Sequence, residues 1–205
     1  HPALGAAEYR MSAKSGGRGV YTFCMCPGGE VICSATEEGG VAVNGMSYFS
    51  RGAENSNSAV DVSVGPEDFG HETLAGVEFQ RRLERAAYAE GYGAPAQTFA
   101  DFIAGNASQR FGSVTPSYRP HTYFMDLNEC LPGYVAAALK EGITRFGRQI
   151  KGFDMPDAVL TGVETRTSSP VRILRGANLQ AQGIAGLYPA GDGAGYAGGI
   201  VSAAV

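Results

Sequence analysis

Strand-like runs in the first and last parts of the chain enclose a long stretch with helical spacing, and this order constrains the fold most. Short runs rich in Val, Ile, Tyr and Phe occupy residues 20–64. Further runs follow at 158–164, 171–174 and 186–188. Between them, apolar residues recur at helical spacing over about 66–147. Grouped strands and helices predict an α+β fold, here a mainly antiparallel sheet or partial barrel with a helical insert.

The β-rich first part is expected to begin with a hairpin. Residues 20–26 end at the turn Pro27-Gly28-Gly29, and residues 30–35 are expected to return beside them. Two more strands are expected at 41–43 and 59–64.

The helical stretch is expected to contain three helices. The first covers 66–92, with Pro66 at its start and Gly91 at its stop. Its alternating Arg and Glu residues, Glu78, Arg81, Arg82, Glu84, Arg85 and Glu90, predict a solvated face. Pro95 opens the second helix, 96–104, and the third covers 133–147.

Composition excludes several classes of function. The net charge is −4 and no basic stripe occurs, so nucleic acid is not an expected partner. No apolar run reaches eighteen residues and no signal peptide is apparent, so no membrane partner is expected. Cytoplasmic residence is expected because the four cysteines are predicted to be free thiols.

The four cysteines are expected to be buried or half-buried free thiols, with a redox role as the alternative. Cys24 and Cys26 are two residues apart, and this spacing suits neither a disulfide nor a C-x-x-C zinc site. No metal site is predicted. The histidines share no motif spacing, and His121, in a proline-rich loop, is the one worth testing.

The segment from Gly186 to Ile200 reads as a short strand, a glycine turn and a helix start, an arrangement that can hold a phosphate. Gly193, Gly195 and Gly198 spell G-x-G-x-x-G, but a dinucleotide-binding unit also needs an acidic residue about twenty positions later. A glycine-rich helix packed on a sheet and a simple nucleotide-binding turn remain alternatives.

Asp192 separates these alternatives. A carboxylate between two glycines is placed to accept hydrogen bonds from sugar hydroxyls, and it would repel an adjacent phosphate. We expect Asp192 to face a ribose or ribityl chain. A turn-stabilising or N-cap aspartate is the alternative.

Four stretches of the chain resemble one family. The run 188–200 resembles the C-terminal FAD motif of the FAD-dependent (NAD(FAD)-utilizing) dehydrogenases, and the stretches 17–29, 44–47 and 151–172 are similar to the same family. The resemblance implies that Asp192 holds the ribityl hydroxyls of FAD. It places Gly198, Gly199 and Ile200 near the pyrophosphate and the isoalloxazine edge, and the cofactor set is Gly191, Asp192, Gly193, Gly195, Gly198, Gly199 and Ile200.

The resemblance also implies a domain division. We expect a β-rich substrate-side domain at 1–65 and 151–185, a helical insert at 66–150, and the C-terminal flavin-motif strand-turn-helix at 186–205. The family's N-terminal dinucleotide-binding unit does not match any part of this sequence. We therefore expect a fragment that holds half of an FAD site and is inactive alone.

The implied function is part of a flavin-dependent oxidoreductase acting on a small molecule, with NAD(P) as a possible electron partner. Arg166 and Arg172 are the candidates for substrate contact, because a guanidinium forks onto a carboxylate or an electron-rich flavin oxygen. The alternative is a non-catalytic module that binds a ligand or a protein partner.

Overall fold

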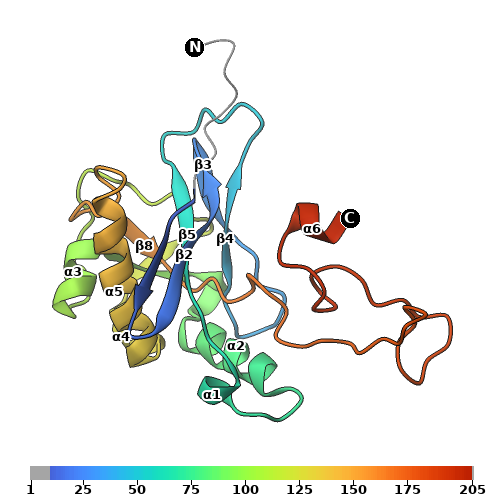
Figure 1. Ribbon diagram of the computed structural model, residues 1–205. Helices are drawn as coiled ribbons and strands as arrows, with labels where there is room; N and C mark the ends of the chain where they lie inside the picture. Colours follow the sequence, from blue (N-terminus) through green and yellow to red (C-terminus); the bar gives the residue numbers. More distant parts are fainter. Residues whose placement is uncertain (1–9, 205) are drawn as a thin grey trace. The chain divides into compact units, whose positions relative to one another are not determined.

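The computed structural model describes residues 10–204 and is shown in Figure 1. The chain divides into two compact units, each built from two stretches of sequence. Within the described residues, unit 1 contains 10–63 and 84–164, and unit 2 contains 64–83 and 165–204. These bounds fall at other places than the expected domain bounds. The fold class is α+β, as expected, with mostly antiparallel strand pairs and no closed barrel in the described part.

The first sheet of unit 1 has the strand order β1-β2-β5, with β1 at Ser12–Ser15, β2 at Arg18–Cys26 and β5 at Asn57–Val62. Gly16 and Gly17 join β1 to β2, with φ of 54° and 83°. Positive φ at both central residues is the geometry of a type I′ turn, which matches the twist of paired strands. The sequence did not predict β1, because its four residues contain one apolar side chain.

The expected hairpin on either side of Pro27 is wrong. Strand β3 (Gly29–Cys33) pairs with β4 (Val43–Ser47), whereas β2 pairs with β1 and β5. A side chain at Gly28, where φ is 53°, would collide with the backbone carbonyl of Arg51. The Pro-Gly segment is therefore packed tightly on a neighbouring loop, and it carries the chain from one sheet into the next.

The third sheet has the order β7-β6-β8, with β6 at Ala94–Thr98, β7 at Thr122–Phe124 and β8 at Val159–Thr161. The expected helix 96–104 is therefore wrong in its first turn, since α3 spans only Phe99–Ala104. All five residues of β6 are buried between two partner strands. Sheet pairing outweighs the helix-start signal of Pro95.

Helix α5 (Gly133–Gly147) follows the short helix α4 (Leu127–Cys130) and confirms the third expected helix. It packs along the β1-β2-β5 sheet (Figure 1). The core cluster there contains Met11, Val20, Ala138 and Phe146. Gly142 lets the helix approach the sheet, because a Cβ there would lie 2.5 Å from Cγ1 of Val20.

The expected first helix is divided into separate pieces. Helix α1 (Pro66–Phe69) ends at Gly70, where φ is 101°. Helix α2 (Ala75–Ala86) follows, and the 3-10 helix η1 (Glu90–Tyr92) belongs to unit 1. The glycine breaks the helical path because few other residues adopt that φ.

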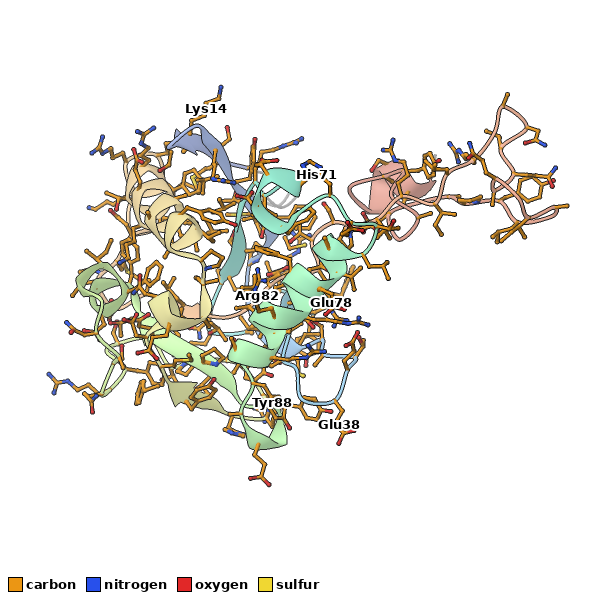
Figure 2. All side chains as sticks on the ribbon, turned by 90° about the horizontal axis from the view of Figure 1, so that it is seen from below. Lys14, Glu38, His71, Glu78, Arg82 and Tyr88 are labelled. Carbon is orange, nitrogen blue, oxygen red and sulfur yellow. The ribbon has the colours of Figure 1, made fainter. Side chains whose placement is uncertain are left out.

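The charged face of α2 is partly as expected. Figure 2 labels Glu78 and Arg82 on this helix. Glu78 forms an ion pair with Arg81, in which Oε1 and Nη1 lie 2.6 Å apart, and both side chains are in contact with solvent. The expectation is wrong for Glu84, because only 3% of this residue is exposed. It belongs to the interior of unit 1 rather than to a solvated face.

The C-terminal segment of unit 2, residues 165–204, contains helix α6 (Ile200–Ala204) and, in its described part, no strand. The expected strands at 171–174 and 186–188 do not form. A strand needs a hydrogen-bonded neighbour, and here the described backbone makes turns with one isolated bridge, between Arg175 and Ala181. The turn and the helix start of the expected C-terminal motif are present, without its strand.

Candidate functional site

The glycine turn at residues 191–196 is the centre of the candidate site. Gly191 and Gly195 have φ of 75° and 79°, a region that glycine adopts without strain. The Gly195 amide donates to the Asp192 carbonyl at 2.8 Å, and the Tyr196 amide donates to the Gly191 carbonyl at 2.9 Å. The two hydrogen bonds close the turn and fix the direction of the side chains that it carries.

The turn packs against the segment that precedes it. A Cβ at Gly195 would lie 2.5 Å from the Val171 carbonyl oxygen, so only glycine fits there without a shift. The Ile173 amide donates to the Ala194 carbonyl at 3.2 Å, and the Ser169 hydroxyl donates to the Gly193 carbonyl at 3.2 Å. The residues from 169 to 175 therefore serve as the platform of the turn.

Helix α2 contacts the beginning of this platform and the residues just before it. Nε2 of Gln80 donates to the Thr165 carbonyl at 2.7 Å. A Cβ at Gly76 would lie 2.9 Å from Cβ of Pro170, so the glycine admits the proline ring against the helix. Both contacts lie within unit 2. The local fold thus fixes the platform at its start, before it reaches the turn.

Asp192 carries an unsatisfied acceptor. Its Oδ1 atom is buried and has no hydrogen-bond partner among residues 10–204. Leaving a buried polar atom unpaired costs about 1–3 kcal/mol, and more when the group is charged. The side chain is therefore placed to accept a hydrogen bond from a donor that is not part of the protein.

Two glycines that follow Asp192 in the sequence border open space. A Cβ at Gly193 or at Gly198 would meet nothing within 4 Å, and both residues are exposed. Among the described residues, the amides of these two glycines donate to no protein acceptor. Backbone amides without side chains around them are accessible to an anion.

Two arginines from the platform reach the same turn. Nε of Arg172 donates to the Gly195 carbonyl at 2.9 Å, and Nη1 of Arg175 donates to the Pro189 carbonyl at 2.7 Å. Their guanidinium carbons lie 5.0 Å and 3.8 Å from the ring centroid of Tyr196. The turn therefore combines one carboxylate with two cations stacked on one aromatic ring.

The structure brings together most of the predicted cofactor set. Gly191, Asp192, Gly193 and Gly195 form the turn, Gly198 and Gly199 follow it, and Ile200 begins α6. Their contact with a cofactor stays a prediction. Arg172 donates to the Gly195 carbonyl of the turn, and its expected contact with substrate stays a prediction. Arg166 is exposed near the start of the platform, and its substrate role stays a prediction.

Sequence reasoning did not name Arg175 and Tyr196 as parts of this site. The available signal was the pair of arginines three residues apart, in the segment that leads toward a glycine turn with a tyrosine. Three-residue spacing usually indicates a helix face. The spacing alone does not predict that both arginines contact Tyr196, because that contact depends on how the platform packs beside the turn.

A second polar cluster lies in unit 1. Glu164 follows β8, and burial together with the charge of Asp61 on β5 raises the pKa of its carboxyl to about 7. Burial, the charge of Glu164, and then Cys26 and Asp61 raise the pKa of the Cys24 thiol to about 11. Cys24 is exposed, contrary to the expectation for the four cysteines, and all four are free thiols.

The described residues offer no alternative metal or histidine centre. No group of three His, Cys, Asp or Glu side chains is placed to hold a metal ion in residues 10–204. His121 is exposed, and a Cβ at Gly93 would collide with its ring, so it covers the backbone at the start of β6. The structure therefore shows a packing role for His121.

Within the described part of the chain, no helix has the length and apolar character needed to cross a membrane.

Two comparisons with known proteins found matches. The family model described as "FAD-dependent protein, C-terminal domain-like" matches residues 1–167. A protein of Clostridium beijerinckii named "Uncharacterized protein" is 53% identical over 211 residues, which cover 100% of this chain and 40% of that protein. The chain thus spans well under half the length of this relative. The glycine turn at 191–196 lies beyond the part that the family model matches.

Proposed function

Because the chain belongs to the FAD-dependent protein family whose C-terminal domain model it matches, we propose that it forms part of a flavin-dependent dehydrogenase. In this proposal, unit 1 is on the substrate side, and the glycine turn of unit 2 supplies one half of the FAD site. The family match supports association with FAD and a flavin-related, oxidoreductase-like protein. The dehydrogenase activity and the half-site are the proposal.

The unpartnered Oδ1 atom of Asp192 carries the proposal. A ribityl chain presents several hydroxyl donors, and a buried carboxylate oxygen without a partner is the acceptor that they need. The open space and unused amides at Gly193 and Gly198 suit the anionic group that adjoins the ribityl chain in FAD. The residues present therefore fit the cofactor that the family implies.

FAD, when bound, supplies the hydride and electron chemistry, which no side chain of this chain has to provide. The chain's own residues bind and orient the cofactor through the turn. Arg166 contacts a small-molecule substrate, and NAD(P) serves as the electron partner. Cytoplasmic residence is part of the same proposal.

The test is the colour and the cofactor of the full-length protein. We expect the purified protein to show flavin absorbance bands, and the compound released by denaturation to have the mass of FAD. A full-length protein that is colourless and does not change the fluorescence of added FAD would contradict the proposal.

A second candidate is a module that binds a protein partner, and one observation favours it. Tyr48 and Phe49, after β4, are 64% and 106% exposed, and Met46 beside them is 54% exposed. Large apolar side chains grouped on a surface often mark an interface. Flavin separates the candidates, since a binding module without a cofactor would stay colourless under the same test.

A further inference from the structure

Arg172, Arg175 and Tyr196 form a stack that the proposed ribityl contact does not use. The guanidinium groups lie within 5.0 Å and 3.8 Å of the same ring centroid. Cation–π contact of this kind fixes the plane of a guanidinium and leaves its edge open for hydrogen bonds. The ring therefore positions two forks beside one glycine turn.

Each arginine keeps most of its hydrogen-bonding capacity. Arg172 donates through Nε to the Gly195 carbonyl, and Arg175 donates through Nη1 to the Pro189 carbonyl. A guanidinium has five N–H donors, so four remain on each side chain. The two contacts orient the arginines on the turn without satisfying them.

Neither arginine has an anionic partner within the described residues 10–204. The ion pairs there involve other arginines, such as Arg81 with Glu78 and Arg145 with Glu141. Two like charges on one ring repel each other, and an anion that neutralises both relieves this cost. The stack therefore places two guanidinium groups beside the turn without a counter-charge from the described residues.

The geometry points to Arg172 and Arg175 as the ligands of the diphosphate of the bound flavin dinucleotide. This inference rests on the proposed function and deepens it, because it assigns the charged half of the cofactor to named side chains. It also moves Arg172 from the substrate to the cofactor.

The order of chemical groups in the turn supports a diphosphate over a lone carboxylate. Asp192 offers an acceptor for hydroxyls, and the arginines on the same turn offer donors and positive charge. In a flavin dinucleotide, a hydroxylated chain leads directly into two phosphates. Paired guanidinium forks match phosphate oxygens, and a lone carboxylate would satisfy only one fork.

The experiment compares three flavins on the full-length apoprotein. FAD, FMN and riboflavin share the isoalloxazine ring and the ribityl chain, and they carry two, one and no phosphates. Flavin fluorescence titration gives the Kd of each for the wild type, Arg172→Met, Arg175→Met and Arg175→Lys. Arg110→Met, which removes an exposed arginine in unit 1, is the matched control.

We expect each Met variant to weaken FAD by about 10-fold or more, FMN by less, and riboflavin by under about 2-fold. Arg175→Lys keeps the charge but not the fork, so FAD binding should recover only in part. The ³¹P signals of bound FAD should shift in Arg175→Lys and stay unchanged in Arg110→Met. These spectra report on the bound state even where affinity changes little.

Two results would overturn the inference and leave the proposed function in place. The Met variants could weaken all three flavins equally, which would mean that the arginines only hold the turn. They could also leave FAD binding and the ³¹P shifts unchanged. A wild-type protein that binds none of the three flavins would instead contradict the proposed function itself.

Discussion

Helix α5 approaches its sheet so closely that Gly142 faces Cγ1 of Val20 without room for a methyl group, since an added Cβ would lie 2.5 Å away. Val20 is fully buried, and it belongs to the cluster that joins the helix to β2. The contact sets the distance between the helix and the sheet in unit 1.

The first prediction is that Gly142→Ala destabilises the protein. Overpacking a core costs about 1–3 kcal/mol, more than the roughly 1 kcal/mol that alanine gains over glycine in a helix. Urea unfolding measures the difference. Gly133→Ala is the matched control in the same helix, because a Cβ there meets nothing within 4 Å. If Gly142→Ala were as stable as the wild type or more stable, the helix could move away from Val20 without a loss of free energy of unfolding.

Glu164 gives a prediction about pH. Burial, and then the charge of Asp61, raise the pKa of its carboxyl to about 7, above the ordinary value of 4.5. Between these values the folded state binds a proton that the unfolded state has released, so Glu164 makes stability fall as pH rises through this window. Below it both states are protonated, and above it both are ionised.

Glu164→Gln removes this dependence. The unfolding free energy of the variant minus that of the wild type should increase from about pH 4.5 to 7 and then level off. Asp61→Asn should lower the raised pKa of Glu164 only in part, because burial is the larger cause. The upper end of the pH window should therefore move down without reaching the lower end. Urea unfolding at several pH values checks both. A difference that does not change with pH would show that Glu164 titrates normally.

Cys24 gives a prediction about reactivity. Cys24 is an exposed residue, yet partial burial of its thiol, and then the nearby Glu164, Cys26 and Asp61, raise the pKa of the thiol to about 11. The thiolate is the reactive form, and its lower fraction is partly offset by its higher nucleophilicity, so we expect maleimide labelling at pH 8 to be about 10-fold slower than for an ordinary thiol.

The thiol measurement uses Cys26→Ser/Cys33→Ser protein, so that Cys24 is the remaining accessible cysteine. Adding Glu164→Gln should speed labelling, because it removes a nearby negative charge. Cys130 is buried and serves as the internal reference for unfolding. Labelling of Cys24 at the rate of an ordinary thiol, in folded protein that still carries Glu164, would contradict the account and favour a redox role.

The sequence predicted the parts of the fold that depend on local pattern. Helix 133–147 was found within its observed bounds, because its apolar spacing and its glycine ends agree. The glycine turn was found because positive φ is tied to glycine.

The parts that depend on distant partners were not predictable. β3 pairs with β4 rather than with β2, because the packing of Gly28 against Arg51 turns the chain into another sheet. β6 looked like the start of a helix, yet it lies buried between β7 and β8. No local pattern records which edges a strand will find.

The same limit applied to the candidate site. Asp192 stood out in the sequence, because a carboxylate between two glycines is placed to accept hydrogen bonds from sugar hydroxyls. Arg175 and Tyr196 did not, because their contact requires the platform to run back beside the turn. Glu164 and Asp61 are 103 positions apart, and only the fold places their charges close enough to interact.

The most direct test of the account is the affinity of the full-length protein for FAD with and without the Asp192 carboxylate. A hydrogen bond to a charged group is worth about 1.5–3 kcal/mol, which corresponds to about 10- to 150-fold in Kd. We expect Asp192→Ala to weaken FAD, FMN and riboflavin alike by a factor in this range. Glu72→Ala, an exposed carboxylate of unit 2, should leave all three unchanged. Wild-type affinity for FAD in Asp192→Ala would contradict the account, because the buried acceptor would then have no part in holding the cofactor.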